Sequence, residues 1–142
     1  MPEGSWEWAL GQYLKAHPEA PVFADISFLS EIAGKSPVEI SRYAAIVRRW
    51  IDAFDPTCRH LLFGSDWLML GASPAYDGYV KRVDAFFRNA VGLDNIQMSR
   101  LFNLNAAHFL GLREGDAARD RLRQFYAKHN VPISRLPSFE KA

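Results

Sequence analysis

The sequence predicts an α/β fold in which two parallel strands are joined by a long helix and followed by several more helices. The apolar run at residues 61–63 is too short for a helix, and residues 22–28 are rich in β-branched and aromatic side chains, so both are typical of strands. Between them, residues 37–54 have the apolar spacing of an amphipathic helix. Because strand–helix–strand units form right-handed parallel crossovers, the two strands are expected to lie side by side.

The first helix is predicted at residues 6–16, with Ser5 as its N-cap and Pro18 as its stop signal. One face of this helix is apolar and is expected to face the core: Trp6, Leu10, Tyr13 and Leu14. The first strand, at residues 22–28, begins after Pro21 and runs into a loop.

The connecting helix has the clearest start signal in the chain. Ser36 and Glu39 form the pattern of a capping box, and Pro37 occupies the first helical position. Asp55 closes the helix. Its inward stripe is predicted to consist of Ile40, Tyr43, Ala44, Val47, Trp50, Ile51 and Phe54.

The second strand, at residues 61–63, is uniformly apolar and is expected to be buried on both faces. Gly64 then lets the backbone turn, and residues 68–74 are predicted to form a loop. A helix is predicted over residues 75–89. Its inward positions are expected to be Tyr79, Val83, Phe86, Phe87 and Ala90.

The remaining residues predict short helices and a charged one. Asp94 is expected to cap a helix through residue 101, and Asn103 or Asn105 to cap another that ends at Gly111.

A last charged helix begins at Asp116 and stops at residues 130–132, followed by an irregular tail. The chain therefore divides into residues 1–112, which hold both strands, and residues 113–142, which form a carboxyl-terminal helix and tail.

Composition and charge exclude several classes of protein. The 142 residues fit one domain, and 49% hydrophobic residues suffice for a packed core. A net charge of +1 gives no electrostatic footprint for nucleic acid or an anionic membrane. The single Cys58 excludes an intrachain disulfide and suits a reducing compartment. Since no apolar run approaches the roughly twenty residues of a membrane span, a cytoplasmic location is expected.

Two parallel strands do not form a free-standing sheet. Both predicted strands are apolar on both faces, and their outer backbone groups need hydrogen-bond partners. The chain therefore resembles a slice of a larger α/β architecture. We expect it to form a homo-oligomer or to bind a companion chain that supplies the missing strands.

One carboxylate, Asp66, lies just beyond the carboxyl end of the second strand, after Gly64 and Ser65. Ligands in α/β folds bind at the carboxyl ends of the strands, so this position is typical of a catalytic or metal-binding group. The alternative is structural, because Ser65 and Asp66 are also residues that cap a following element.

Three segments, at residues 21–27, 61–67 and 103–112, resemble in order and spacing the carboxyl-terminal end of the amidohydrolase-2 family. The most specific of them is the run Phe63-Gly64-Ser65-Asp66-Trp67. Members of this family are metal-dependent hydrolases and decarboxylases built on a (β/α)8 barrel. The resemblance implies that residues 1–112 correspond to the last two β/α units of such a barrel.

The resemblance also implies roles for individual residues. Asp66 would end the eighth barrel strand, where it binds the metal or transfers a proton to and from the activated water. Asp25 and Ser27, at the end of the seventh strand, and Trp67 would bind a small-molecule substrate. Asn105 would be a structural cap beneath the barrel rim, and a complete member would hold zinc or manganese.

The chain departs from the family at the metal site. The family holds its metal mainly with a His-x-His pair and two further histidines on earlier strands. The four histidines of this chain do not match these positions: His17, His60, His108 and His129. One aspartate does not hold a catalytic zinc, which takes three protein ligands. The isolated chain is therefore expected to bind no metal and to be inactive.

A different class of function is a non-catalytic interaction module, which would use the strand edge and the aromatic-rich helices to bind another protein. A helix-turn-helix reading of residues 94–112 is disfavoured, because this stretch has only Arg100 before its end to contact phosphates.

Overall fold

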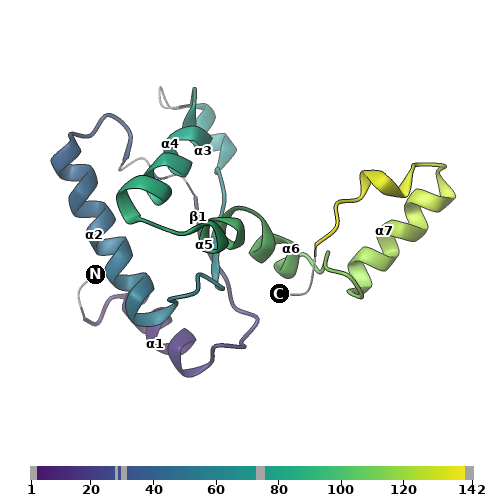
Figure 1. Cartoon of the computed structure of the whole chain (residues 1–142), viewed down its shortest axis with the longest axis horizontal. Helices are drawn as coiled ribbons and strands as arrows, with labels where there is room; N and C mark the ends of the chain where they lie inside the picture. Colours follow the sequence, from purple (N-terminus) through teal and green to yellow (C-terminus); the bar gives the residue numbers. More distant parts are fainter. Residues whose placement is uncertain (1–2, 28, 30–31, 73–75, 140–142) are drawn as a thin grey trace.

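The computed structural model describes residues 3–27, 29, 32–72 and 76–139 and shows a mixed α/β fold with two parallel strands (Figure 1). In chain order the elements are α1 (Trp6–Ala16), β1 (Ala24–Ile26), α2 (Pro37–Phe54), β2 (Leu61–Phe63), α3 (Trp67–Gly71), α4 (Tyr79–Ala85), the π-helical turn η2 (Phe86–Val91), α5 (Asn95–Ser99), the π-helical turn η3 (Arg100–Leu104), α6 (Asn105–Phe109), α7 (Ala117–Lys128) and the 3₁₀ turn η4 (Ile133–Arg135).

The parallel crossover predicted from the sequence is confirmed. β1 and β2 pair in parallel, with Ala24 opposite Leu61 and Ile26 opposite Phe63, and α2 connects them. β1 is shorter than predicted, because Val22 and Phe23 precede the ladder; Phe28 lies outside the described residues.

Burial of the strands on both faces is wrong for most positions. Leu61 is buried, but Leu62 and Phe63 are half-buried. The physical reason is the size of the sheet. In a two-stranded sheet each strand has only one neighbouring strand, so its side chains are surrounded less completely than in the middle of a larger sheet.

The starts of α1 and α2 follow the predicted capping chemistry. The Ser5 hydroxyl accepts a hydrogen bond from the Trp8 amide, and the Ser36–Glu39 capping box is complete. The indole N–H of Trp50 in α2 donates to the Glu7 carbonyl in α1 at 2.9 Å. This bond ties the amino-terminal helix to the crossover helix.

Close packing of α1 on α2 depends on a glycine. Gly11 lies directly against the Phe54 ring, where a Cβ atom would overlap it. Trp8 packs edge-on to the same ring, with 4.9 Å between centroids. Leu14 is buried as predicted, whereas Trp6 is 71% exposed, so its predicted inward position is wrong. Trp6 lies in the first turn of α1, beside an open cleft described below.

The segment after β2 contains more helix than predicted. Residues 67–71 form the short helix α3 instead of a loop, while residues 73–75 lie outside the description. The next helix begins at Tyr79 rather than at residue 75 and ends in the wide turn η2. Since a π-helical turn holds an extra residue, the inward position moves from Ala90, which is exposed, to Val91, which is buried.

The capping roles predicted for Asn103 and Asn105 are wrong. Helix α5 continues without a break through η3 into α6, so Asn105 lies inside a helical stretch. Its buried side-chain amide donates to the carbonyls of Cys58 and Leu61, at 2.7 and 2.8 Å. The asparagine therefore anchors the helix to the beginning of β2. Asp94 does cap α5, as predicted.

The core lies between α2, β2 and the helices that follow β2. Its most completely buried large side chains are Leu14, Ile51, Val83, Phe87 and Leu101. Stacked rings of Phe63 and Phe102, 4.7 Å apart, join β2 to η3.

Residues 112–139, which we call the arm, project from this body (Figure 1). The chain turns into the arm at Gly111, which has a φ of 65°. Buried Arg119 donates to the carbonyls of Leu112 and Pro137 and pairs with Glu114. One guanidinium thus holds both ends of the arm together.

We expect Asn105→Ala to lower the free energy of unfolding by about 2–4 kcal/mol, because it leaves two carbonyls at the start of β2 without their donor. Urea unfolding measures this change. Asn103→Ala is the matched control, since Asn103 is exposed two positions earlier in the same helical stretch; its effect should stay within about 0.5 kcal/mol. Equal effects of the two substitutions would contradict the assigned role.

Candidate functional site

The carboxyl ends of β1 and β2 lie at the same end of the sheet, because the strands are parallel. Of the residues that the sequence singled out, Ser27, Asp66 and Trp67 follow these ends, and Asp25 is the middle residue of β1. The fold therefore gathers all four at one end of the sheet.

The Asp25 carboxylate lies close against Gly64. A Cβ atom built on Gly64 would lie 2.7 Å from Asp25 Oδ2 and nearer still to Oδ1. Only a glycine leaves room for the carboxylate in this position. Gly64 therefore makes room for the Asp25 side chain of β1, in addition to letting the backbone turn after β2.

Asp66 has a left-handed backbone, with φ 44° and ψ 60°, which is uncommon outside glycine, asparagine and aspartate. It occupies the position before α3, and its carbonyl accepts a hydrogen bond from the Leu70 amide at 2.9 Å. Asp66 is the N-cap residue of α3, as the structural alternative predicts, although its side chain makes no capping hydrogen bond. Asp66 is exposed, and the neighbouring Trp67 is 72% exposed.

Metal-ligand chemistry is sparse in the described part of the chain. Among these residues no group of three or more histidine, cysteine, aspartate or glutamate side chains is placed to hold a metal ion. Asp66, the predicted ligand, would supply one oxygen donor from the end of β2. The remaining donors of a three-ligand site would have to come from elsewhere.

The histidines lie away from this end of the sheet. His60 precedes β2 at the opposite end of the strand, and His108 in α6 packs edge-on against Phe23. Burial lowers the pKa of His108, with Arg113 contributing in the same direction. His17 and His129 pack against Tyr13 and Phe125. Three of the histidines therefore pack against aromatic rings, and the His60 ring faces two backbone carbonyls.

An apolar cleft of about 540 Å³ opens beside β1, between α1, α2 and η2. Its walls include the side chains of Leu10, Val47, Trp50, Phe86 and Phe87. Asp25 and Ser27 also line this cleft, whereas Asp66 and Trp67 do not. The structure therefore divides the predicted site residues between the cleft and the exposed turn after β2.

One edge of the sheet is open next to this cleft. Ala24 donates to the His60 carbonyl and the Ile26 carbonyl accepts from Gly64, so the alternation of a parallel ladder turns the Asp25 N–H and C=O away from β2. In the described ranges the sheet has only these two strands. The open edge is a template for another strand.

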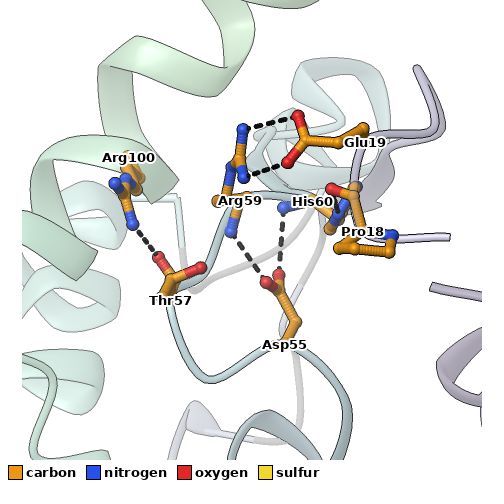
Figure 2. Close-up of polar contacts among 7 residues, drawn as sticks. All are labelled: Pro18, Glu19, Asp55, Thr57, Arg59, His60 and Arg100. Carbon is orange, nitrogen blue, oxygen red and sulfur yellow. Dashed lines mark hydrogen bonds and ion pairs between the residues drawn. The ribbon is translucent and has the colours of Figure 1, made fainter. Parts of the chain in front are cut away.

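Sequence reasoning missed a polar network at the amino end of β2 (Figure 2). The Asp55 carboxylate accepts hydrogen bonds from the amides of Arg59 and His60, both at 2.9 Å. Burial raises the pKa of Asp55, against the opposing effect of the two amide donors. An aspartate followed by proline is a turn signal, and this pair could have indicated the turn that Asp55 holds.

The same network ties the loop before β1 to the start of β2. Both His60 ring nitrogens face carbonyls, Nδ1 that of Val22 at 2.9 Å and Nε2 that of Pro18 at 3.1 Å. Arg59 forms a two-pronged ion pair with Glu19 and lowers its pKa (Figure 2). These contacts all join residues of the chain to one another, so they hold the loop before β1 against the start of β2.

Comparison of the chain with models of protein families, with curated proteins and with solved structures found no match. The candidate site is therefore argued from its own geometry. No helix in the described ranges combines the length and the apolar character needed to cross a membrane.

Cys58 should be chemically inert in the folded chain. It is fully buried, and desolvation together with nearby Asp55 raises its pKa from 9.0 to about 12. Because the thiolate is the reactive form, we expect a thiol reagent at mildly alkaline pH to modify the native chain only as fast as it unfolds. The chain unfolded in urea is the control, and equal rates for the native and unfolded chains would contradict this prediction.

Gly64→Ala should displace the Asp25 carboxylate and lower the free energy of unfolding by about 1 kcal/mol, a modest loss because the carboxylate can rotate away. The loss should disappear in an Asp25→Ala background, so a double-mutant cycle measures the contact. Gly71→Ala is the matched control, since nothing lies within 4 Å of its Cβ position. Equal losses with and without Asp25 would refute the contact.

Proposed function

We propose that this chain is the carboxyl-terminal portion of an amidohydrolase-like, metal-dependent hydrolase or decarboxylase, whose (β/α)8 barrel is completed by a companion chain or by further copies. The observation that supports this most is the parallel β1–α2–β2 unit with carboxylates at its carboxyl end, Asp25 in β1 and Asp66 beyond β2. Barrel enzymes collect their catalytic residues from the same ends of several strands.

Asp66 is the proposed catalytic residue. Its backbone strain supports this role, because residues held in sparsely populated conformations cluster at functional sites. Its exposed carboxylate makes no capping bond, so it is available to a metal-bound water from which it would accept a proton. Zinc or manganese would make that water acidic and would polarise the substrate.

Asp25, Ser27 and Trp67 would contact a small-molecule substrate at the same end of the sheet. The proposal assigns no activity to the chain alone, since a catalytic zinc takes three protein ligands and Asp66 offers one. It includes a cytoplasmic location, which suits a chain whose single cysteine, Cys58, is buried and unpaired.

A second candidate function is a non-catalytic interaction module. The apolar cleft and the open β1 edge favour it, because both are features of surfaces that bind another polypeptide. The two proposals differ in whether the carboxylates at the strand ends have a chemical role.

The test is reconstitution with the neighbouring open reading frame. A companion that supplies a His-x-His pair and two later histidines at strand ends should form a complex with this chain that turns over small amides or carboxylates when loaded with zinc or manganese. A stable complex without turnover of any substrate of these classes would favour the interaction module.

In the reconstituted complex, Asp66→Asn should lower kcat by about 10²–10⁴-fold, because it keeps the shape of the side chain but removes the proton acceptor. The melting temperature should hardly change, since the side chain is exposed. Asp77→Asn, at another exposed carboxylate, is the matched control and should retain full turnover. Unchanged turnover in Asp66→Asn would refute the catalytic assignment.

A further inference from the structure

The arm carries an exposed basic and aromatic face. Arg121, Phe125 and Lys128 follow one another at helical spacing in α7, so their side chains share one side of the helix. All three are exposed, Phe125 by 53%. Neither Arg121 nor Lys128 forms an ion pair with a described residue, unlike Arg119 and Arg123 on the same helix. An exposed phenylalanine between two unpaired cations is typical of a face that binds another surface.

The cleft beside β1 has the complementary character. Among the described residues that line it, the charged ones are Glu7 and Asp25, and most of the others are apolar. A hydrogen bond from Ser5 lowers the pKa of Glu7, so this carboxylate is ionised at neutral pH. The described part of the lining therefore presents apolar surface with two carboxylates and no basic side chain.

The charge of the whole chain is divided in the same way. The arm holds six basic and three acidic residues, whereas residues 1–111 hold ten basic and twelve acidic ones. The arm and the body thus attract each other. Such complementarity orients partners and selects the matching surface.

We propose that two copies of this chain form a dimer in which the Arg121–Phe125–Lys128 face of each arm docks into the acidic, apolar cleft beside β1 of the other copy. Phe125 enters the apolar lining, and the flanking cations meet Glu7 and Asp25. An amphipathic helix in an apolar groove is a recurrent mode of recognition. Because each copy gives one arm and receives one, the assembly closes with two-fold symmetry.

The arm of one copy does not fill its own cleft. Figure 1 shows α7 well apart from α1 and α2, the helices that flank the cleft. The turn at Gly111 and the Arg119 contacts hold the arm in this extended position. When two copies exchange their arms, the basic face of α7 and the apolar cleft are both covered, and each arm keeps its conformation.

This inference concerns the chain by itself and does not rest on the proposed catalysis. The missing barrel strands would approach the same edge of β1, so a companion would displace the docked arm. Failure of the reconstitution assay leaves the dimer untouched, and loss of the dimer leaves that assay untouched.

Sedimentation velocity of the full chain tests the proposal, and we expect a concentration-dependent dimer at micromolar concentration. Phe125→Glu should raise the dimer Kd about tenfold or more, because a buried aromatic anchor is lost. Arg121→Glu and Glu7→Arg should each weaken the dimer, and the double variant Arg121→Glu/Glu7→Arg should restore it. Arg135→Glu, an equal charge change elsewhere on the arm, should leave the Kd unchanged.

The charge exchange keeps the test decisive if Phe125→Glu misfolds the arm, since the rescue depends on two exposed or half-exposed side chains. A chain that stays monomeric overturns the proposal. A dimer that is insensitive to Arg121→Glu, or one that the double variant fails to restore, also overturns it and shows that another surface joins the copies.

Discussion

Hydrogen bonding at the edges of a two-stranded parallel sheet is the constraint on which this structure depends. On the outer side of β2, the Asn105 amide reaches the Leu61 carbonyl and also the Cys58 carbonyl in the loop before the strand. The helical stretch from α5 to α6 is fixed to the sheet by this side chain and by the Phe63–Phe102 stack. On the outer side of β1 the described residues provide no strand, and the apolar cleft lies there.

The two ends of the sheet have different chemistry. The amino end is closed by internal bonds, in which Asp55 binds the amides of Arg59 and His60, and the His60 ring faces two carbonyls. The carboxyl end holds Asp25 and Asp66, both exposed. At the amino end the polar groups bond to one another, whereas at the carboxyl end the carboxylates are exposed. This difference is typical of α/β proteins that bind ligands at the carboxyl ends of their strands.

Local signals predicted the parts of the fold that depend on local physics. The Ser36–Glu39 capping box, the stripe of α2 and the cap at Asp94 required only neighbouring residues, and the structure confirms them. The errors arose where distant contacts decide the outcome. Asn105 satisfies carbonyls more than forty residues away, which no helical pattern reveals. For the site, the sequence placed Asp25 and Asp66 at the strand ends, but not the fit of Asp25 over Gly64 or the exposure of Trp6.

The open edge of β1 and the left-handed turn at Asp66 have one explanation in common. Aspartate tolerates the left-handed conformation better than most residues, whereas an unpaired strand edge next to an apolar cleft lowers the stability of a free chain. A second polypeptide at the β1 edge would recover this loss by covering the cleft and pairing the strand. It would also surround the exposed carboxylates at the carboxyl end and lower the local dielectric, which strengthens their interaction with any bound cation. Under the proposed function, a companion chain at the β1 edge would therefore affect both the assembly and the carboxylates of the candidate site.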